Sequence, residues 1–172
     1  MKRNILFLDI DGILNTDGTS NFVNRDTGEE THKKDPRRVY GMDRDLIANL
    51  QRLVELTGAE IILSSTWRKP PFGTEKTMAV MRRRDWTGPD FAGETPVHLE
   101  KFSSTYSQRG AEIDEWIERN GLPDDHYLVL DDNLITGDSS MYWIFVNPMR
   151  GFDADYLKEA LRHFGVDYEV SK

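Results

Sequence analysis

The sequence predicts an α/β fold, a three-layer α/β/α sandwich whose central sheet is mostly parallel. Three observations lead to this prediction. Short apolar runs end abruptly in polar residues, amphipathic helical patterns lie between them, and no apolar run is long enough to cross a bilayer. Strands that alternate with helices pair in parallel through right-handed crossovers. Since 172 residues are enough to bury a core, we expect one domain over residues 1–172.

Four continuous apolar runs are the expected strands, because a strand buried on both faces shows no alternation. They span residues 5–8, 61–63, 127–130 and 143–146. Apolar residues recur at helical spacing over 46–54, 113–117 and 156–164. Asp153 is placed to cap the start of the third helix, and a glycine follows each of the three patterns.

Two segments fit this scheme poorly, 15–41 and 69–106, which are rich in Gly, Pro, Thr and charge. We interpret both as small insertions over the active site, with a short helix at 77–84 and no assignable strand. Basic clusters occur at 32–38 and 82–84. Solvated surface is the simpler interpretation of these clusters, and substrate binding is the alternative.

Composition limits the possible chemistry and partners. The net charge is −8, which argues against a protein that coats nucleic acid through general basicity. The absence of cysteine excludes disulfides, thiolate metal sites and cysteine nucleophiles, so any metal must bind oxygen or histidine. The first residues do not form a signal peptide. We expect a cytoplasmic protein with no membrane association and no obligate protein partner.

Polar side chains follow three of the expected strands. These residues are Asp9, Asp11 and Gly12 after the first run, Ser64 and Ser65 after the second, and Asp131 and Asp132 after the third. The carboxyl ends of parallel strands meet in one crevice, so these groups should converge there. Four carboxylates in one crevice repel one another unless a cation neutralises them, and oxygen ligands suit Mg²⁺.

The pair Asp9 and Asp11 suits phosphoryl chemistry. Gly12 allows the backbone to turn sharply after the strand, so that both carboxylates can face one reacting centre. One carboxylate can attack phosphorus while the other, kept protonated by its surroundings, donates a proton to the leaving oxygen. Ser64 and a nearby cation would hold the phosphate oxygens.

These motifs resemble those of the haloacid dehalogenase-like (HAD) hydrolases, whose fold is Rossmann-like. Residues 7–12 (Phe-Leu-Asp-Ile-Asp-Gly), 61–64 (Ile-Ile-Leu-Ser) and 128–132 (Leu-Val-Leu-Asp-Asp) are similar to the first, second and fourth motifs of that superfamily. The third motif is a single Lys or Arg. Arg109 is the preferred match, and Lys101 is the alternative.

The resemblance implies a role for each matched residue. Asp9 would form an aspartyl-phosphate, and Asp11 would act as general acid and then as general base. A magnesium ion would be held by Asp9, the backbone carbonyl of Asp11, and a carboxylate of Asp131 or Asp132.

The phosphoryl group would be held by Ser64 and Arg109. Residues 64–68 and 109–113 also look like those of small, minimally capped members, including polynucleotide 3′-phosphatase domains of RNA and DNA repair enzymes. We therefore add Ser65 and Arg68 as candidate phosphate ligands. The alternatives are that the two serines only cap a helix and that Arg109 is a solvated charge.

The expected activity is Mg²⁺-dependent hydrolysis of a phosphomonoester. The substrate would be a phosphorylated small molecule, such as a nucleotide, or the end of a nucleic acid. Two alternatives remain: a non-catalytic module that binds Mg²⁺ or a partner, and a phosphotransferase with an acceptor other than water.

Overall fold

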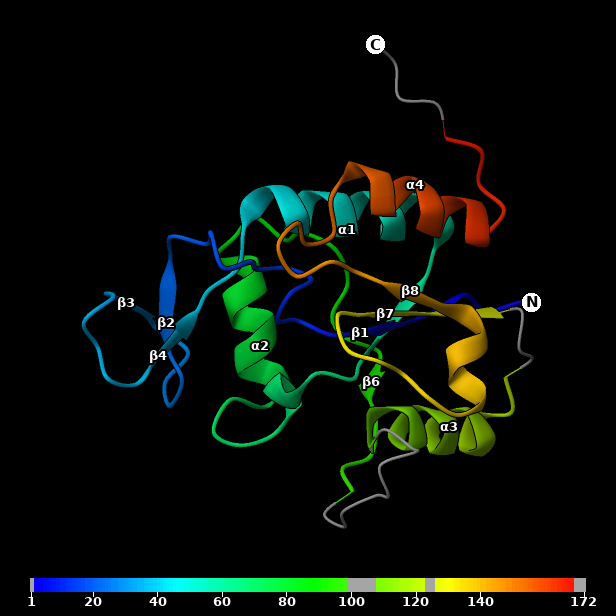
Figure 1. Ribbon diagram of the computed structural model, residues 1–172, viewed down its shortest axis with the longest axis horizontal. Helices are drawn as coiled ribbons and strands as arrows, with labels where there is room; N and C mark the ends of the chain where they lie inside the picture. The colour runs from blue at the N-terminus through cyan, green and yellow to red at the C-terminus, as the bar shows by residue number, and fades with distance from the viewer. Residues whose placement is uncertain (1, 99–107, 123–125, 169–172) are drawn as a thin grey trace.

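A central parallel sheet organises the computed structural model, which describes residues 2–98, 108–122 and 126–168 (Figure 1). The strand order is β6-β5-β1-β7-β8, and every neighbouring pair is parallel. The strands are β1 (Ile5–Leu8), β5 (Glu60–Leu63), β6 (Gly93–Glu94), β7 (Tyr127–Asp131) and β8 (Trp143–Phe145). This arrangement confirms the predicted α/β sandwich.

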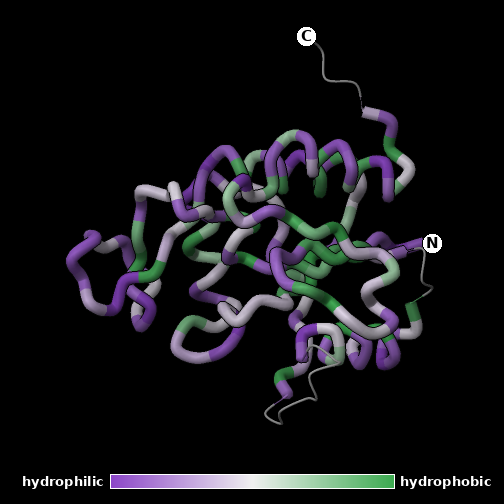
Figure 2. Tube along the Cα trace, in the orientation of Figure 1, coloured by the Kyte–Doolittle hydropathy of each residue, from purple (hydrophilic) through white to green (hydrophobic). Residues whose placement is uncertain are grey.

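Helices cover both faces of the sheet (Figure 1). The helices α1 (Arg44–Thr57) and α4 (Ala154–His163) lie side by side on one face, and α3 (Gln108–Asn120) lies on the other. Alternation along β1 explains why the whole strand is apolar. Leu6 and Leu8 join the hydrophobic cluster under α1 and α4, whereas Ile5 and Phe7 join the cluster that includes Ile113 of α3. The green sheet strands in Figure 2 show this buried apolar centre.

The segment 15–41 forms a second, antiparallel sheet, which its sequence did not predict. Its strands are β2 (Phe22–Asn24), β3 (Glu30–Thr31) and β4 (Arg38–Tyr40), in the order β3-β2-β4. This small sheet lies on the side of the molecule toward which β1 and β7 run (Figure 1). Each strand is too short to show a clear periodic pattern.

The segment 69–106 contributes both a helix and a strand. The helix α2 spans Gly73–Arg82, slightly earlier than the expected 77–84. The strand β6 pairs with β5 at one edge of the central sheet, so this part of the segment belongs to the sheet and does not lie over it.

Two capping residues expected from the sequence are confirmed, one at the start of α4 and one at the end of α1. The Asp153 carboxylate accepts hydrogen bonds from the backbone N–H groups of Asp155 and Tyr156 and so caps α4. Gly58 ends α1 in the left-handed conformation, with φ of 64°. Among the described residues, the helices are too short or too polar to cross a membrane.

Candidate active site

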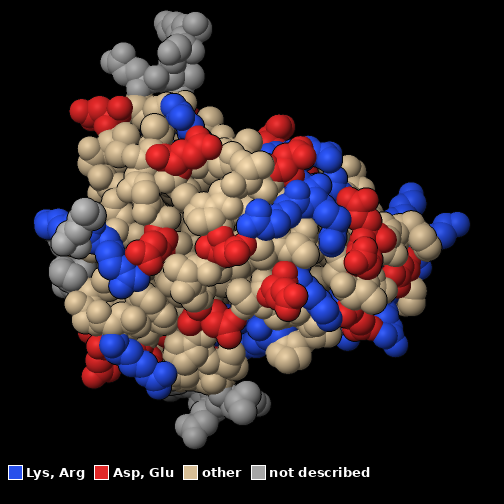
Figure 3. Space-filling view, turned by 180° about the vertical axis from the view of Figure 1, so that it is seen from behind, with Lys and Arg blue, Asp and Glu red and all other residues tan. Residues whose placement is uncertain are grey.

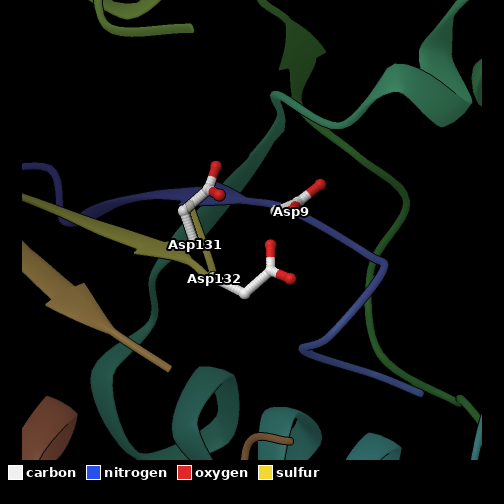
Figure 4. Close-up of side chains that lie close together, drawn as sticks. All are labelled: Asp9, Asp131 and Asp132. Carbon is white, nitrogen blue, oxygen red and sulfur yellow. The ribbon is translucent and has the colours of Figure 1, made fainter. Parts of the chain in front are cut away.

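Three carboxylates meet at the carboxyl ends of β1 and β7. Leu8 is in register with Leu130, and the N–H of Asp9 donates to the carbonyl of Leu130 at 3.0 Å. Parallel pairing therefore places Asp9 beside Asp131, and Asp132 follows from the same strand end (Figure 4). One oxygen of each carboxylate lies within 4.8 Å of the others. Asp9 and Asp131 are almost fully buried, with 3% and 0% exposed.

Arg109 is the cation of this group. It is the second residue of α3, and its Nη1 lies 2.9 Å from Asp9 Oδ1 and 2.6 Å from Asp131 Oδ2. Burial works against the charged guanidinium, but the attraction of Asp9 and Asp131 outweighs it and raises the pKa of Arg109. The preferred third-motif residue is thus part of the site, while Lys101 lies outside the described residues.

The single positive charge of Arg109 does not neutralise the negative charge of three clustered carboxylates. Burial, followed by repulsion from Asp9, raises the pKa of both Asp131 and Asp132. Three convergent oxygen donors with excess negative charge form the type of site that Mg²⁺ prefers. The residues therefore fit a divalent cation, with Asp9, Asp131 and Asp132 each offering one oxygen.

Asp11 lies apart from Asp9, Asp131 and Asp132 and is held by hydrogen bonds of its own. Its Oδ1 accepts from Nδ2 of Asn15 at 3.0 Å, and its Oδ2 accepts from Nε1 of Trp67 at 3.0 Å. The residue is exposed at the mouth of the site. Desolvation of the carboxyl nevertheless raises its pKa above the ordinary value, against the effect of the two hydrogen bonds. A raised pKa favours the protonated form that a general acid needs.

Asn15 and Trp67 are positioning residues that the sequence did not reveal. Asn15 is buried, and besides bonding Asp11 it accepts from the N–H of Gly12 at 2.9 Å. Trp67 stacks on Phe72 with ring centroids 4.3 Å apart, so its indole is held in place by packing. Trp67 thus both packs in the interior and holds the acid through its N–H.

The two serines after β5 differ in their surroundings. Ser64 is fully buried, and its Oγ has no hydrogen-bond partner in the described part of the chain. An orphaned hydroxyl beside the acids is available to a ligand oxygen. In contrast, the Oγ of Ser65 accepts from the N–H of Trp67 at 3.2 Å and caps the 3₁₀ turn Thr66–Arg68. The capping alternative therefore describes Ser65.

Arg68 is bonded inside the protein, which argues against the phosphate-binding role expected for it. Its side chain is 1% exposed and forms an ion pair with Glu112 at 2.5 Å. Its nitrogens also donate to four backbone carbonyls, those of Ser64, Ser65, Thr95 and Pro96. These five bonds match the five N–H groups of a guanidinium, so none is left for a substrate.

Gly12 is required where the chain leaves β1. Its φ is +78°, and a β-carbon at this position would overlap the carboxylate of Asp132. We expect Gly12→Ala to displace Asp132, because neither the left-handed backbone nor the space accommodates a methyl group. The strain alone amounts to about 1–2 kcal/mol.

The measurement is Mg²⁺ affinity by isothermal titration calorimetry, which we expect to fall about tenfold, equivalent to about 1.4 kcal/mol of lost binding free energy. Gly58→Ala is the matched control, since it also has a positive φ, lies in open space and is remote from the acids. Equal Mg²⁺ affinity in the two variants would contradict the role assigned to Gly12.

Comparison with known proteins places this geometry in a family. No curated protein matches the chain. A family model described as "HAD domain in Swiss Army Knife RNA repair proteins" matches residues 5–157, which include all the acids described above. HAD membership indicates a phosphatase-type hydrolase, in agreement with the resemblance seen in the motifs. Because the match covers most of the sequence, the chain belongs to the HAD domains of Swiss Army Knife RNA repair proteins.

Proposed function

We propose that this protein hydrolyses a phosphomonoester at the end of an RNA, with Asp9 as nucleophile, Asp11 as general acid and base, and Mg²⁺ as cofactor. The observation that carries the proposal is the separation of two kinds of carboxylate. Asp9 is paired with Arg109 beside Asp131 and Asp132, whereas Asp11 is bonded by Asn15 apart from them and has a raised pKa. A nucleophile and a proton donor need opposite protonation states at the same pH.

In the first half-reaction, a carboxylate oxygen of Asp9 attacks phosphorus. The bond between phosphorus and the ester oxygen breaks, its electron pair stays on the leaving oxygen, and that oxygen takes the proton of Asp11. The products are the alcohol and an aspartyl-phosphate on Asp9.

In the second half-reaction, the Asp11 carboxylate removes a proton from water. The water oxygen bonds to phosphorus, the acyl-phosphate bond breaks, and its electron pair returns to the Asp9 carboxylate. Inorganic phosphate leaves, and Asp11 is protonated again.

The remaining residues orient and neutralise the phosphoryl group. Arg109 holds one oxygen of Asp9 and so leaves the other for attack, while the orphaned hydroxyl of Ser64 can donate to a phosphoryl oxygen. A Mg²⁺ held by Asp9, Asp131 and Asp132 would supply positive charge to offset the carboxylates and the phosphate.

The space next to Arg109 supports an extended substrate. A pocket of about 210 Å³ lies there, and Thr66, Lys69 and Asn133 are among its lining residues. Ligand pockets that enclose a small molecule are usually larger, about 300–1,000 Å³. None of the catalytic acids lines this pocket, so it suits a part of the substrate next to the reacting phosphate, and the family description favours RNA as that substrate.

The direct test is phosphate release from a panel of substrates, measured with Mg²⁺ or with chelator. The panel contains oligoribonucleotides with a 3′- or a 5′-phosphate, matched oligodeoxyribonucleotides, nucleoside monophosphates and p-nitrophenyl phosphate. We expect Mg²⁺-dependent release that is fastest from a phosphorylated RNA end. Faster release from the mononucleotides would overturn the RNA assignment, and no release from any ester would overturn the hydrolase itself.

The acid cluster also predicts how pH and Mg²⁺ affect stability. The folded protein raises the pKa of Asp131 and Asp132, so the folded state binds protons more tightly than the unfolded state, and stability without metal should fall as pH rises through these values. Mg²⁺ requires deprotonated carboxylates, so its stabilisation should be larger at about pH 8 than at about pH 5.5. At 100 times its dissociation constant, the metal should add about 2.7 kcal/mol.

Differential scanning calorimetry at both pH values, with Mg²⁺ or with chelator, measures this effect. We expect a rise in Tm of roughly 5–10 °C at the higher pH. Asp132→Asn should reduce the rise, and Asp167→Asn, an exposed acid after α4, should leave it unchanged. A rise of equal size at both pH values would show that these carboxylates do not bind the metal.

A further inference from the structure

The small sheet has one buried face and one outward face. Cross-strand pairs place Val23 opposite Val39 and Phe22 opposite Tyr40. Val23 is buried and Val39 packs against the main core, so the alternate residues point outward. Tyr40 is 40% exposed.

The outward face carries an aromatic pair with a cation beside it. The rings of Phe22 and Tyr40 are stacked, with centroids 5.5 Å apart and an angle of 28° between planes. The guanidinium of Arg38 lies over Phe22, 5.9 Å from the ring centroid. These residues, with Lys33 and Val39, line a surface pocket of about 470 Å³.

The positive charge on this face is not neutralised by neighbours. Within the described residues, no carboxylate lies at ion-pair distance from Lys33 or Arg38. The carboxylate of Asp35 is nearby, but it accepts from Thr31, Asn24 and the N–H of Arg37, so its oxygens are already bonded within the loop. A chain of net charge −8 thus has a locally basic face. Figure 3 shows basic side chains projecting at this end of the molecule, on the right of that view, with acidic side chains among them.

The small sheet is connected directly to the active site. The Nδ2 of Asn15, which bonds Asp11, also donates to the carbonyl of Gly41 at 3.0 Å. Gly41 follows Tyr40, and its N–H donates to the carbonyl of Asn21, which precedes Phe22. These hydrogen bonds therefore link the general acid Asp11 to the residues that directly adjoin the aromatic pair.

We propose that this outward face binds the single-stranded RNA adjacent to the phosphorylated end, with an unpaired base stacked on the Phe22–Tyr40 pair and Lys33 and Arg38 on the phosphates. Exposed aromatic rings beside unpaired cations are the combination that binds single strands, because every base has a stacking face and every linkage a negative charge. The identity of the polymer as RNA rests on the proposed function.

The test uses an oligoribonucleotide of about ten nucleotides, a length within reach of one single-strand site. It carries a fluorophore and no terminal phosphate, so binding does not depend on the catalytic acids. Fluorescence anisotropy measures its affinity for the protein. We expect Tyr40→Ala to weaken binding about tenfold, and Arg38→Ala to weaken it and to reduce its dependence on salt.

Matched variants separate stacking from general effects. Tyr40→Phe keeps the ring and should bind like the wild type, as should Arg162→Ala, which removes an exposed arginine of α4. Weaker binding of a duplex and of an abasic strand would support stacking. Wild-type affinity in both Tyr40→Ala and Arg38→Ala, or no binding by the wild type, would overturn the proposal. Tighter binding of the matched deoxyribonucleotide would overturn the assignment to RNA.

A second measurement distinguishes failure of this proposal from failure of the proposed function. Hydrolysis of p-nitrophenyl phosphate by the wild type needs the catalytic acids and no RNA-binding face, so it is measured beside RNA binding on the same preparation. If the wild type hydrolyses this ester while the variants bind RNA normally, only the binding face is wrong. If RNA binding depends on Tyr40 but no ester is hydrolysed, the binding face stands and the proposed hydrolase is wrong.

Discussion

Asp9→Asn should lower kcat by at least about 10⁴-fold, as expected for loss of a catalytic nucleophile. Asparagine has nearly the same shape, so the variant should fold, but its amide oxygen is a poor nucleophile and carries no charge for Arg109 to hold. The measurement is phosphate release from the best substrate of the panel. Asp167→Asn, the exposed acid after α4, makes the same chemical change away from the site and should leave kcat unchanged.

Asp11→Asn tests the same mechanism by a different observable. With a substrate whose leaving group needs no proton, such as p-nitrophenyl phosphate, Asp9 can still attack, whereas water is no longer activated. We expect a burst of p-nitrophenol followed by slow turnover. Mass spectrometry should find one added phosphoryl group, on the peptide that contains Asp9. Turnover by Asp9→Asn, or a phosphoryl group on another residue, would contradict Asp9 as the nucleophile.

Glu112→Gln is expected to cause the largest loss of stability. The substitution leaves the Arg68 guanidinium buried without its counterion, and breaking a buried pair in this way costs about 3–5 kcal/mol. Burial already lowers the pKa of Arg68, and Glu112 opposes that effect. For a chain of this length, Tm should fall by roughly 6–20 °C, measured by calorimetry.

Two further variants show whether burial causes this loss. Arg82→Met breaks the exposed pair with Asp90 and should cost about 0–1 kcal/mol. The double variant Arg68→Met, Glu112→Met removes both charges and should be more stable than Glu112→Gln alone, because no unpaired charge remains buried. A small loss in Glu112→Gln would mean that Arg68 has enough compensation from its four carbonyl partners.

The central sheet could be predicted because its strands are buried on both faces. A run such as 5–8 has no polar position, so it stands out even at four residues. Strands β2 to β4 have two or three residues each and one exposed face, so Phe22 and Arg38 appear as ordinary loop residues. The two-residue strand β6 consists of a glycine and a glutamate, and it is a strand only because it pairs with β5.

The acids of the site could be predicted because strand ends converge whatever their sequence separation. In contrast, no rule of this kind predicts from the sequence which side chains pair with one another. Arg68 and Arg109 are both arginines near predicted motifs, and only the position of Glu112 on α3 determines that the first is internal. The bonds from Asn15 and Trp67 to Asp11 depend on the path of two loops, which no local pattern specifies.

The central place of β1 affects how the protein reaches its native state during synthesis. Ile5 pairs with Glu60 on one side and with Tyr127 on the other, so β1 gains its second neighbour only after more than half of the printed sequence has followed it. Such distant pairing slows folding and leaves an apolar strand edge exposed in the meantime. The nascent chain through β5 should therefore need protection from aggregation until β7 emerges, and the cluster of Asp9, Asp131 and Asp132 cannot form before that moment.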